Sequence, residues 1–552
     1  MSAALGPRAL WRMMPRGEAT AFAVYVVLSV AAALAGSLSA VLLVPLIRDG
    51  GLLAPSADAS AACFALSGVI FALTRWQASR LGARQVARLG HHLRTQVHAR
   101  LLGAPLPALA PLRSAEIANV LTHNGETLVQ AFSAMQQLAV ATITSLVSLA
   151  FALWISPLLM LAMPLLLVVI VVTSRLSGRE HARVSRRYVT DMTGLFWHSE
   201  DVPRRLRHVR SFGREAAERD SYGDVSAGLA GGYRRQLELV ASSRLVLELV
   251  AATGIPAAFV LARRWPAIDG ASLVAVGLLL GRLLPYLTST RQAFQQWRSA
   301  APAFALWQRY MALPVRPAPG VAGAGASRLG VLFIRRLHIR PPREGLRVEG
   351  LRLAPGELVL VCGDSGIGKS SFVDVLAGMA PAESFEVEHD GVPVGLDAYR
   401  RLIGRGAYVG QNVRPWQRTV RACLAWAAPE TDDATMWAAL DDVGLAPRLT
   451  EGGAGLDTSV DDAAGRLSGG EMQRLLVAQV ILRRPVLAIL DEATSALDAA
   501  AEMAVLGALR RRLPGSILLV VSHRPAVAAL ADRVVRLDAG DVTIGEGVPA
   551  VA

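Results

Sequence analysis

The sequence predicts a two-part fold, in which an α-helical bundle of six membrane spans is followed by an α/β domain built around a phosphate-binding loop. Three observations lead to this prediction. The chain of 552 residues is 53% hydrophobic and only 18% charged, a composition that is unusual for a soluble protein. Its long apolar runs all lie before residue 300, and beyond residue 330 short Val/Leu runs alternate with amphipathic stretches. One of those short runs ends in a glycine-rich turn.

The membrane spans are predicted from length and hydropathy. A helix that crosses a bilayer needs about 20 mostly apolar residues. The chain offers six such runs, at residues 21–47, 59–75, 132–153, 157–174, 239–262 and 271–290. The second and fourth are short enough to be buried core helices, but their alternation with the others favours spans. The first run, about 27 residues long, exceeds the apolar region of a signal peptide, so we expect an uncleaved first span with no peptidase domain before it.

The arginine distribution predicts the orientation of these spans. Segments 76–130 and 175–238 are rich in arginine, whereas the loops at 48–58 and 263–270 are short. By the positive-inside rule the two long segments and both termini are cytoplasmic. The net charge of +13 therefore reflects membrane topology, and we expect no nucleic-acid partner. The use of arginine and alanine with almost no lysine suggests a high-GC bacterial genome and thus a bacterial inner membrane, which predicts membrane lipid around the spans.

Domain boundaries follow from the same pattern. Both basic segments have helical periodicity, so the spanning helices should continue into the cytoplasm and reverse at breakers near 103–112 and 199–203. An Ala/Gly/Pro-rich stretch after residue 312 is typical of a linker. We therefore predict a transmembrane domain at 1–312, a linker at 313–329 and an α/β domain at 330–552. The three cysteines have no metal-ligand spacing, and we expect them to be buried apolar residues.

The glycine-rich turn is the strongest local motif. A buried strand is followed by Gly363, four residues, Gly368, Lys369 and Ser370, and then by a helix. Glycines in this order let backbone N–H groups face phosphate oxygens, and the helix N-terminus adds positive charge. Lys369 is the only lysine of the chain. Its slim ammonium group fits between loop and phosphates, where a planar guanidinium group does not. The alternative is an ordinary strand-to-helix turn.

Four further polar elements follow in order. Gln411 comes after a short strand, Ser468–Gly470 stand at the head of a helix, Asp491 and Glu492 end an apolar strand, and His523 ends another. Taken singly, each has an ordinary explanation as a solvated side chain or a turn. Ligands of open α/β sheets gather at the carboxyl ends of strands. Together and in this order, the elements predict one phosphate-handling site.

Residues 330–552 resemble the nucleotide-binding domain of ATP-binding cassette (ABC) transporters, and with its spans the whole chain resembles a half-size exporter. The resemblance implies ATP and Mg²⁺ as ligands, coupling helices at the two cytoplasmic reversals, and function as a homodimer. The implied Walker A loop consists of Gly363, Asp364, Ser365, Gly366, Ile367, Gly368, Lys369, Ser370 and Ser371. The implied signature includes Ser468, Gly469, Gly470 and Glu471, which would complete the ATP site of the partner subunit.

The resemblance also implies roles for single residues. Glu492 would be the general base of ATP hydrolysis, and Lys369 and His523 would stabilise the transferred phosphoryl group. The implied Mg²⁺ ligands are Ser370, Gln411 and Asp491. A soluble cassette ATPase would lack spans, and a channel that uses ATP only as a switch would not require Glu492, so an active exporter is favoured.

The transported substrate is less well defined. Asp462 stands at the acidic position of a segment that is similar to one found before the signature in exporters. Ionisable residues within spans are functional candidates, here Arg244, Glu248 and Arg282, although Arg244 and Glu248 could equally form an ion pair that locks helix packing. A polar cavity of mixed charge predicts a peptide-like or amphiphilic substrate, and the compact form resembles exporters of modified peptides and microcins. The alternative is a lipid or multidrug exporter.

Some positions depart from the family pattern. The aromatic residue that stacks on adenine should lie near Ile339, where none is present, and His338 or Arg340 would have to substitute for it. Gln479 replaces an arginine that usually follows the signature, and Glu471 replaces its final glutamine. Neither change affects the implied catalytic set.

Overall fold

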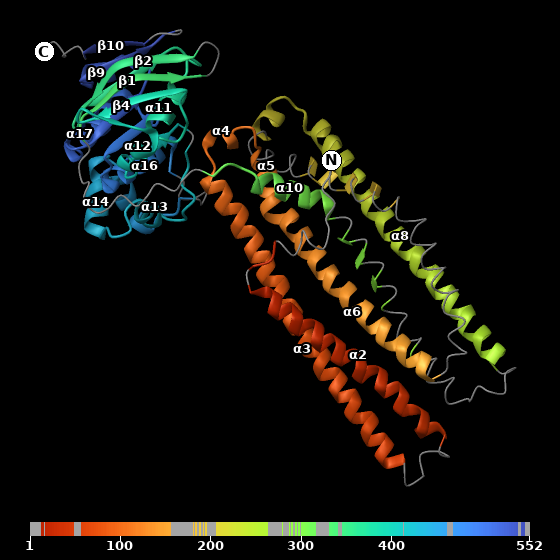
Figure 1. The fold of residues 1–552 in the computed structure, drawn as a ribbon. Helices are drawn as coiled ribbons and strands as arrows, with labels where there is room; N and C mark the ends of the chain where they lie inside the picture. Colours follow the sequence, from red (N-terminus) through yellow and green to blue (C-terminus); the bar gives the residue numbers. More distant parts are fainter. Residues whose placement is uncertain are drawn as a thin grey trace. The chain divides into compact units, whose positions relative to one another are not determined.

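The computed structural model describes most of the chain. Its described residues are 13–15, 17–48, 57–155, 206–262, 300–315, 330–340, 345–411, 413–460, 467–538 and 542–546, together with scattered residues at 180–195 and 279–297. The chain divides into two compact units, with the main boundary between Val315 and Arg316 (Figure 1).

Long helices build the first unit. They are α2 (Glu18–Arg48), α3 (Ala57–Gly103), α6 (Gly125–Ile155) and α8 (Glu215–Ala262). Among the described residues, the stretches long and apolar enough to cross a membrane are Glu18–Leu42, Ala61–Gly103 and Glu116–Ile155. The predicted span at 239–262 lies within α8, whereas the span at 157–174 and most of 271–290 lie outside the described residues.

Helices α2, α3 and α6 pack side by side through small residues. A Cβ atom on Gly82 would lie 3.1 Å from the ring of Tyr25, so the helices approach closely there. The interior is partly polar, because the buried Gln136 donates from Nε2 to Oε1 of Gln85 at 2.8 Å. Outward-facing positions carry large apolar side chains that suit a lipid environment. Cys63 is one of the exposed residues, so the expectation that all three cysteines are buried is wrong.

Short helices follow the cytoplasmic end of α3. They are α4 (Leu106–Leu109), α5 (Ser114–Asn119) and the π-helix η1 (Val120–Asn124), which continues into α6. Helix α10 (Ala301–Met311) packs against α3, η1 and α6 (Figure 1). The second predicted reversal, near 199–203, lies outside the described residues, and residues 206–211 after it are helical.

The second unit contains two sheets. The antiparallel sheet has the order β2-β1-β4-β5, formed by β1 (Leu332–Ile339), β2 (Leu346–Leu353), β4 (Ser384–His389) and β5 (Val392–Val394). The other has the order β10-β9-β3-β8-β7-β6, formed by β3 (Leu358–Gly363), β6 (Ala407–Gly410), β7 (Leu487–Asp491), β8 (Ile517–Val521), β9 (Arg533–Leu537) and β10 (Val542–Glu546). All of its pairings are parallel except that of β10 with β9.

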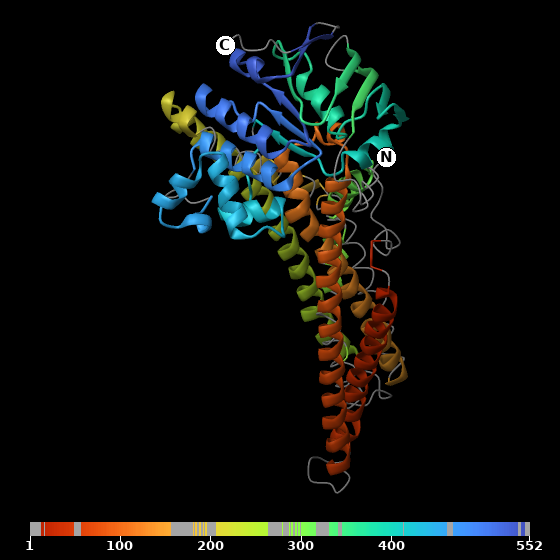
Figure 2. The same cartoon turned by 90° about the vertical axis from the view of Figure 1, so that its left-hand side faces the viewer.

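Helices make up the rest of this unit. They are α11 (Lys369–Leu376), α12 (Leu396–Leu402), α13 (Val420–Ala427), α14 (Asp433–Asp442), α15 (Ala446–Glu451), the 3₁₀-helix η3 (Gly455–Asp457), α16 (Gly469–Arg483), α17 (Ala499–Arg512) and α18 (Pro525–Leu530). Figure 2 shows the green antiparallel strands on one side of this unit and blue helices on the other. Strands β7 and β8 are buried throughout and apolar up to Asp491 at the end of β7, as central strands of a parallel sheet usually are.

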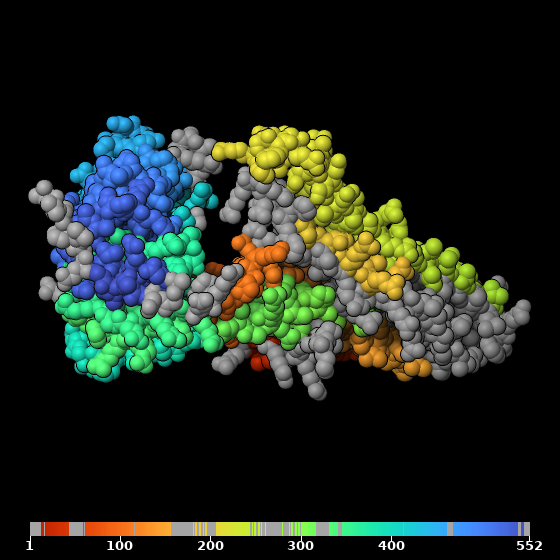
Figure 3. Space-filling model, turned by 90° about the horizontal axis from the view of Figure 1, so that it is seen from above, coloured from red at the N-terminus to blue at the C-terminus, as the bar shows by residue number. Residues whose placement is uncertain are grey.

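The two sheets share one apolar core. Leu337 of β1 and Val361 of β3 belong to the same cluster of buried side chains, which also contains Phe372 of α11. In the space-filling view, the green surface of the antiparallel sheet adjoins the blue surface of the C-terminal elements (Figure 3). Because Phe372 is buried in this core, the start of α11 is held at a fixed position beside β3.

Candidate nucleotide-binding site

The glycine-rich loop joins β3 to α11. Gly363 has φ +147°, and a Cβ atom there would collide with the carbonyl oxygen of Leu537, so only glycine fits. Gly368 adopts φ +112° and is the N-cap of α11. The residues between them, Asp364 to Ile367, connect the strand to the helix with Asp364, Ser365 and Gly366 exposed. The loop therefore presents an open face at a helix N-terminus, the arrangement that binds phosphate.

Lys369 lies beneath this loop. The side chain is only 7% exposed, and its Nζ donates to the carbonyl oxygens of Gly363 and Asp364, each at 2.9 Å. Ser370 follows it with an exposed side chain, and Ser371 is half-buried. The ammonium group is thus held against the loop, next to the face at which an anion would bind.

The register of the parallel sheet brings the other predicted residues to the same edge. Gly410 at the end of β6 pairs with Asp491 at the end of β7, and Asp491 pairs with Val521 at the end of β8. Val521 also pairs with Val361, two residues before the loop begins. Gln411, Glu492, His523 and the loop therefore all follow the carboxyl ends of four adjacent strands, where ligands of such sheets bind.

Asp491 is the centre of a cluster of acidic character. It is 8% exposed, and the hydroxyl group of Tyr408 donates to its Oδ2 at 2.9 Å. Burial and the charge of Asp491 raise the pKa of Asp374, and the same two causes raise the pKa of Tyr408. Carboxylates gathered in this way are the kind of oxygen ligands that Mg²⁺ takes.

Glu492 and His523 face each other across the strand ends. His523 Nε2 lies 3.4 Å from Glu492 Oε1, and the backbone N–H of Glu492 donates to the carbonyl oxygen of Val521 at 3.2 Å. Glu492 adopts φ +52°, a conformation that few residues other than glycine adopt. Strained backbone of this kind persists where the surrounding structure fixes it, often at functional sites.

The signature residues stand at the N-terminus of α16. Ser468 and Glu471 form a capping box, in which the backbone N–H of Glu471 donates to Ser468 Oγ and that of Ser468 donates to Glu471 Oε2 at 2.7 Å. A Cβ atom on Gly470 would lie 3.1 Å from the carbonyl oxygen of Ala496, so this turn packs closely on the segment after Glu492. Gly469 approaches the Ala496 side chain in the same way. The predicted acidic position Asp462 lies outside the described residues.

The structure shows what the residues at two departures from the family pattern contact. His338 Nδ1 and Arg340 Nε each lie 3.0 Å from the carboxylate of Glu383, so both candidates for contact with adenine are bound to one acidic side chain. Gln479 is buried, and its Nε2 donates to the carbonyl oxygen of Cys423 at 2.6 Å. Gln479 therefore serves the packing of α16 against α13.

The predicted membrane candidates are only partly described. The side chains of Arg244 and Arg282 lie outside the described residues, and Glu248 is exposed on α8. The two alternatives for Arg244 and Glu248, a functional role and an ion pair that locks helix packing, both stay predictions.

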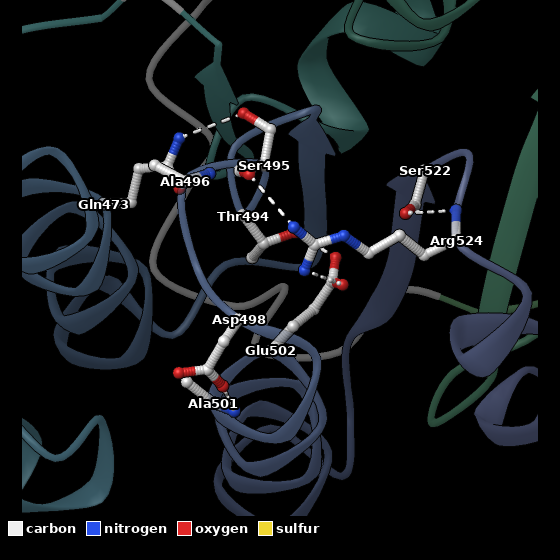
Figure 4. A network of polar contacts seen from close by, with 9 residues as sticks. All are labelled: Gln473, Thr494, Ser495, Ala496, Asp498, Ala501, Glu502, Ser522 and Arg524. Carbon is white, nitrogen blue, oxygen red and sulfur yellow. Dashed lines mark hydrogen bonds and ion pairs between the residues drawn. The ribbon is translucent and has the colours of Figure 1, made fainter.

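Sequence reasoning missed several polar residues near the site. Tyr408 and Asp374 flank Asp491, and Arg524 binds the buried Glu502 in a network around the segment after Glu492 (Figure 4). The position of Arg524 directly after His523 was the one signal in the sequence that could have drawn attention to it. Tyr408 lies three residues before Gln411 in an otherwise apolar strand, where a hydroxyl group requires a partner.

The fold and this site define a class of protein, a P-loop nucleotide-binding domain joined to a helical membrane domain. Family profiles agree: one described as ABC transporter matches residues 347–495, and one described as ABC transporter transmembrane region matches residues 22–260. The chain belongs to the ABC transporters, with a transmembrane and a nucleotide-binding domain fused in one polypeptide. This membership implies ATP binding and confirms the predicted fold class. It also confirms the prediction of a multi-pass inner-membrane protein with a cytoplasmic nucleotide-binding domain.

Curated relatives are named as ATP-dependent lipid A-core flippases. One from Burkholderia orbicola (strain AU 1054) is 38% identical over 191 residues, which covers 35% of this chain and 32% of the relative. Matches to the first relatives thus span about a third of their length. One from Pseudomonas fluorescens (strain Pf0-1) is 28% identical over 498 residues, 86% of this chain and 81% of the relative. The solved structure of a bacterial Atm1-family ABC exporter with ATP bound shares the fold, with a TM-score of 0.79, 21% identity and coverage of 98% of this chain and 96% of the other.

Proposed function

We propose that this chain is an ATP-driven exporter that moves an amphiphilic, lipid-like molecule out of the cytoplasm. The observation that carries the proposal is the assembly at one sheet edge of Lys369, Asp491, Glu492 and His523, in a chain whose described N-terminal part has three helical stretches apolar enough to cross a membrane. A site that only bound nucleotide would not need an acidic side chain and a histidine facing each other at 3.4 Å. ATP hydrolysis that drives movement of the membrane helices explains why the nucleotide site and the membrane domain occur in one chain.

Each residue of the site has a chemical role in this proposal. Glu492 accepts a proton from the water that attacks the γ-phosphate in line, and His523 holds the Glu492 carboxylate and donates to the transferred group. Lys369 turns its ammonium group from the carbonyl oxygens of Gly363 and Asp364 toward the β- and γ-phosphates. The N–H groups of the loop bind the remaining phosphate oxygens.

Mg²⁺ fits the donor atoms at this edge. Asp491 offers a carboxylate, Ser370 an exposed hydroxyl group and Gln411 an exposed amide, all hard oxygen ligands. A bound Mg²⁺ would neutralise charge on the β- and γ-phosphates. Asp374, whose pKa is raised by burial and by the charge of Asp491, places a second carboxyl group beside these donors.

We further propose that two copies act together. The N-terminus of α16, with Ser468 held in its capping box and Gly469 and Gly470 free of side chains, is a surface that an anion can approach. In the resemblance on which this rests, that surface completes the ATP site of a second copy. Glu492→Gln should then trap a dimer in the presence of ATP, which sedimentation or cross-linking of the full chain would detect, and a monomer under those conditions would contradict the proposal.

The substrate class rests on the relatives rather than on the site. Their names as lipid A-core flippases favour an amphiphilic lipid over a peptide. Gln85 and Gln136 form a buried polar pair near the cytoplasmic ends of the predicted spans, where α3 is rich in arginine, so this pair does not decide between a lipid headgroup and a peptide. A peptide substrate would instead rely on the ionic candidates of α8.

The decisive test measures ATP hydrolysis in lipid nanodiscs. A panel of anionic glycolipids, modified peptides and hydrophobic drugs is added to the wild-type chain, with Glu492→Gln as the blank. Stimulation by glycolipids alone supports the proposal. Stimulation by peptides alone would move the substrate to the peptide class, and a rate equal to that of the blank would refute the hydrolytic function itself.

A further inference from the structure

The segment between Glu492 and α17 is held at several points (Figure 4). The side chain of Gln473 on α16 holds two neighbouring residues of this segment: its Nε2 donates to Ser495 Oγ at 3.3 Å, and its Oε1 accepts from the N–H of Ala496 at 2.8 Å. Asp498 then caps α17 by accepting from the N–H of Ala501 at 2.7 Å. The segment is thus fixed to the helix that begins with the signature residues.

Arg524 provides the other anchor of this segment. Its Nη1 donates to Glu502 Oε2 at 3.0 Å, and its Nη2 donates to the carbonyl oxygen of Ser495 at 3.1 Å. The backbone N–H of Arg524 also donates to Ser522 Oγ at 3.2 Å, so both neighbours of His523 are held. One guanidinium group therefore joins the residue after His523 to the segment after Glu492.

The buried carboxylate of Glu502 requires the positive charge of Arg524. Its side chain is only 2% exposed, and its other oxygen, Oε1, accepts from Thr494 Oγ1 at 2.6 Å. A buried carboxylate needs a paired charge and satisfied hydrogen bonds, and the sole ion pair the structure describes for Glu502 is with Arg524. The position of the guanidinium group is therefore fixed from the interior of the domain and not by solvent.

We propose that Arg524 is a positioning residue for ATP hydrolysis, which holds His523 and Glu492 at their mutual distance by tying the two segments together. The inference rests on the proposed function, since it concerns the geometry of that hydrolytic pair. The hydrogen bonds and ion pair that the structure describes for Arg524 involve neither Glu492 nor the nucleotide loop, so it acts through the backbone of Ser495 and of its own neighbours. Its fork of two donors is what allows one side chain to hold a carboxylate and a carbonyl oxygen at once.

Replacing Arg524 with lysine tests whether the charge of this side chain or its geometry is required. Arg524→Lys keeps a positive charge for Glu502, but a single ammonium group lacks the planar fork that reaches both acceptors. Arg510 supplies a matched control, because its Nη1 donates to the carbonyl oxygen of Leu530 at 3.1 Å and its Nη2 to Asp532 Oδ1 at 2.6 Å. Arg510→Lys therefore breaks the same kind of fork in the same domain, away from the segment after Glu492.

The experiment compares steady-state ATP hydrolysis and thermal unfolding of the full chain in nanodiscs. We expect Arg524→Lys to lower kcat at least tenfold with KM for ATP within twofold of wild type, and Arg510→Lys to leave kcat within twofold. Glu502→Gln retains an oxygen acceptor for Arg524, so it should keep more activity than Arg524→Lys.

Three outcomes would overturn the proposal. The first is an equal kcat for Arg524→Lys and Arg510→Lys, and the second is a rise in the KM of Arg524→Lys without a change in its kcat. The third is a loss of kcat that is proportional to the fall in Tm across all three variants. Failure of the proposed function is separate from these, because it would appear as a wild-type rate no higher than that of Glu492→Gln.

Discussion

Removal of the Tyr408 hydroxyl group tests the acidic cluster around Asp491. This hydroxyl group donates to Asp491 Oδ2 at 2.9 Å, and the acceptor is 8% exposed, so water compensates little for its loss. A hydrogen bond to a charged group contributes about 1.5–3 kcal/mol. For a domain of this size that corresponds to a fall in Tm of about 3–12 °C for Tyr408→Phe.

Mg²⁺ should change the size of this effect. A bound cation would itself stabilise the Asp491 charge. Loss of the Tyr408 hydroxyl group should therefore lower Tm by a smaller amount when Mg²⁺ and nucleotide are present. By linkage, the variant should then bind Mg²⁺ more tightly, about tenfold if roughly 1.4 kcal/mol of the loss is recovered. Asp374 strengthens the expectation, because its own charge repels that of Asp491 when no cation is present.

The assay is thermal unfolding of the full chain at a series of Mg²⁺ concentrations with ATP held constant. Tyr399→Phe is the matched control, since it removes a buried hydroxyl group that donates to the carbonyl oxygen of Leu376 at 2.6 Å, away from Asp491. It should lower Tm by an amount that does not depend on Mg²⁺. If both variants respond to Mg²⁺ alike, or if Tyr408→Phe weakens Mg²⁺ binding, Asp491 is not the cation ligand that we assign.

Further substitutions test other parts of the nucleotide-binding unit. Hydrogen bonds with Thr435 hold the pKa of Asp432 below its usual range. The stability that the Asp432 carboxylate contributes is therefore present above about pH 4 and is lost as pH falls through the lowered pKa. Asp432→Asn should flatten this part of a curve of Tm against pH. Gln479→Leu leaves the carbonyl oxygen of Cys423 without its donor, so Tm should fall by the equivalent of about 1–3 kcal/mol while kcat at lower temperature is unchanged. Ser468→Ala removes an N-cap that contributes about 1 kcal/mol, so Tm should fall only slightly. A large fall in kcat for ATP hydrolysis alongside this slight fall in Tm would place Ser468 at the nucleotide.

The motif residues were predictable because each is tied to a local feature of the chain. Lys369, Asp491 and His523 each follow an apolar run bounded by a turn, and such runs become neighbouring parallel strands. The pattern alone did not give the strand order, which places these ends side by side. Their convergence was therefore predicted from the family resemblance and from the general rule for strand ends.

The supporting residues were not predictable for a physical reason. Tyr408 and Asp491 are 83 residues apart, and Arg524 and Glu502 are 22 apart, so no local periodicity connects them. Glu502 lies in the first turn of α17, where an acidic residue is normally explained by the helix dipole and solvent. Only its burial shows that the charge requires Arg524.

Lys369 shows that the shape of a basic side chain, and not only its charge, can decide which residue a site requires. Among the 57 lysines and arginines, only Lys369 is a lysine. Its buried ammonium group lies 2.9 Å from two carbonyl oxygens of the loop, a point contact that a short rotation can redirect to a phosphate. A guanidinium group is wider and planar, and it would displace the backbone whose shape depends on Gly363. A chain that uses arginine at every other basic position thus keeps lysine at the one place where size, rather than charge, decides whether the site can form.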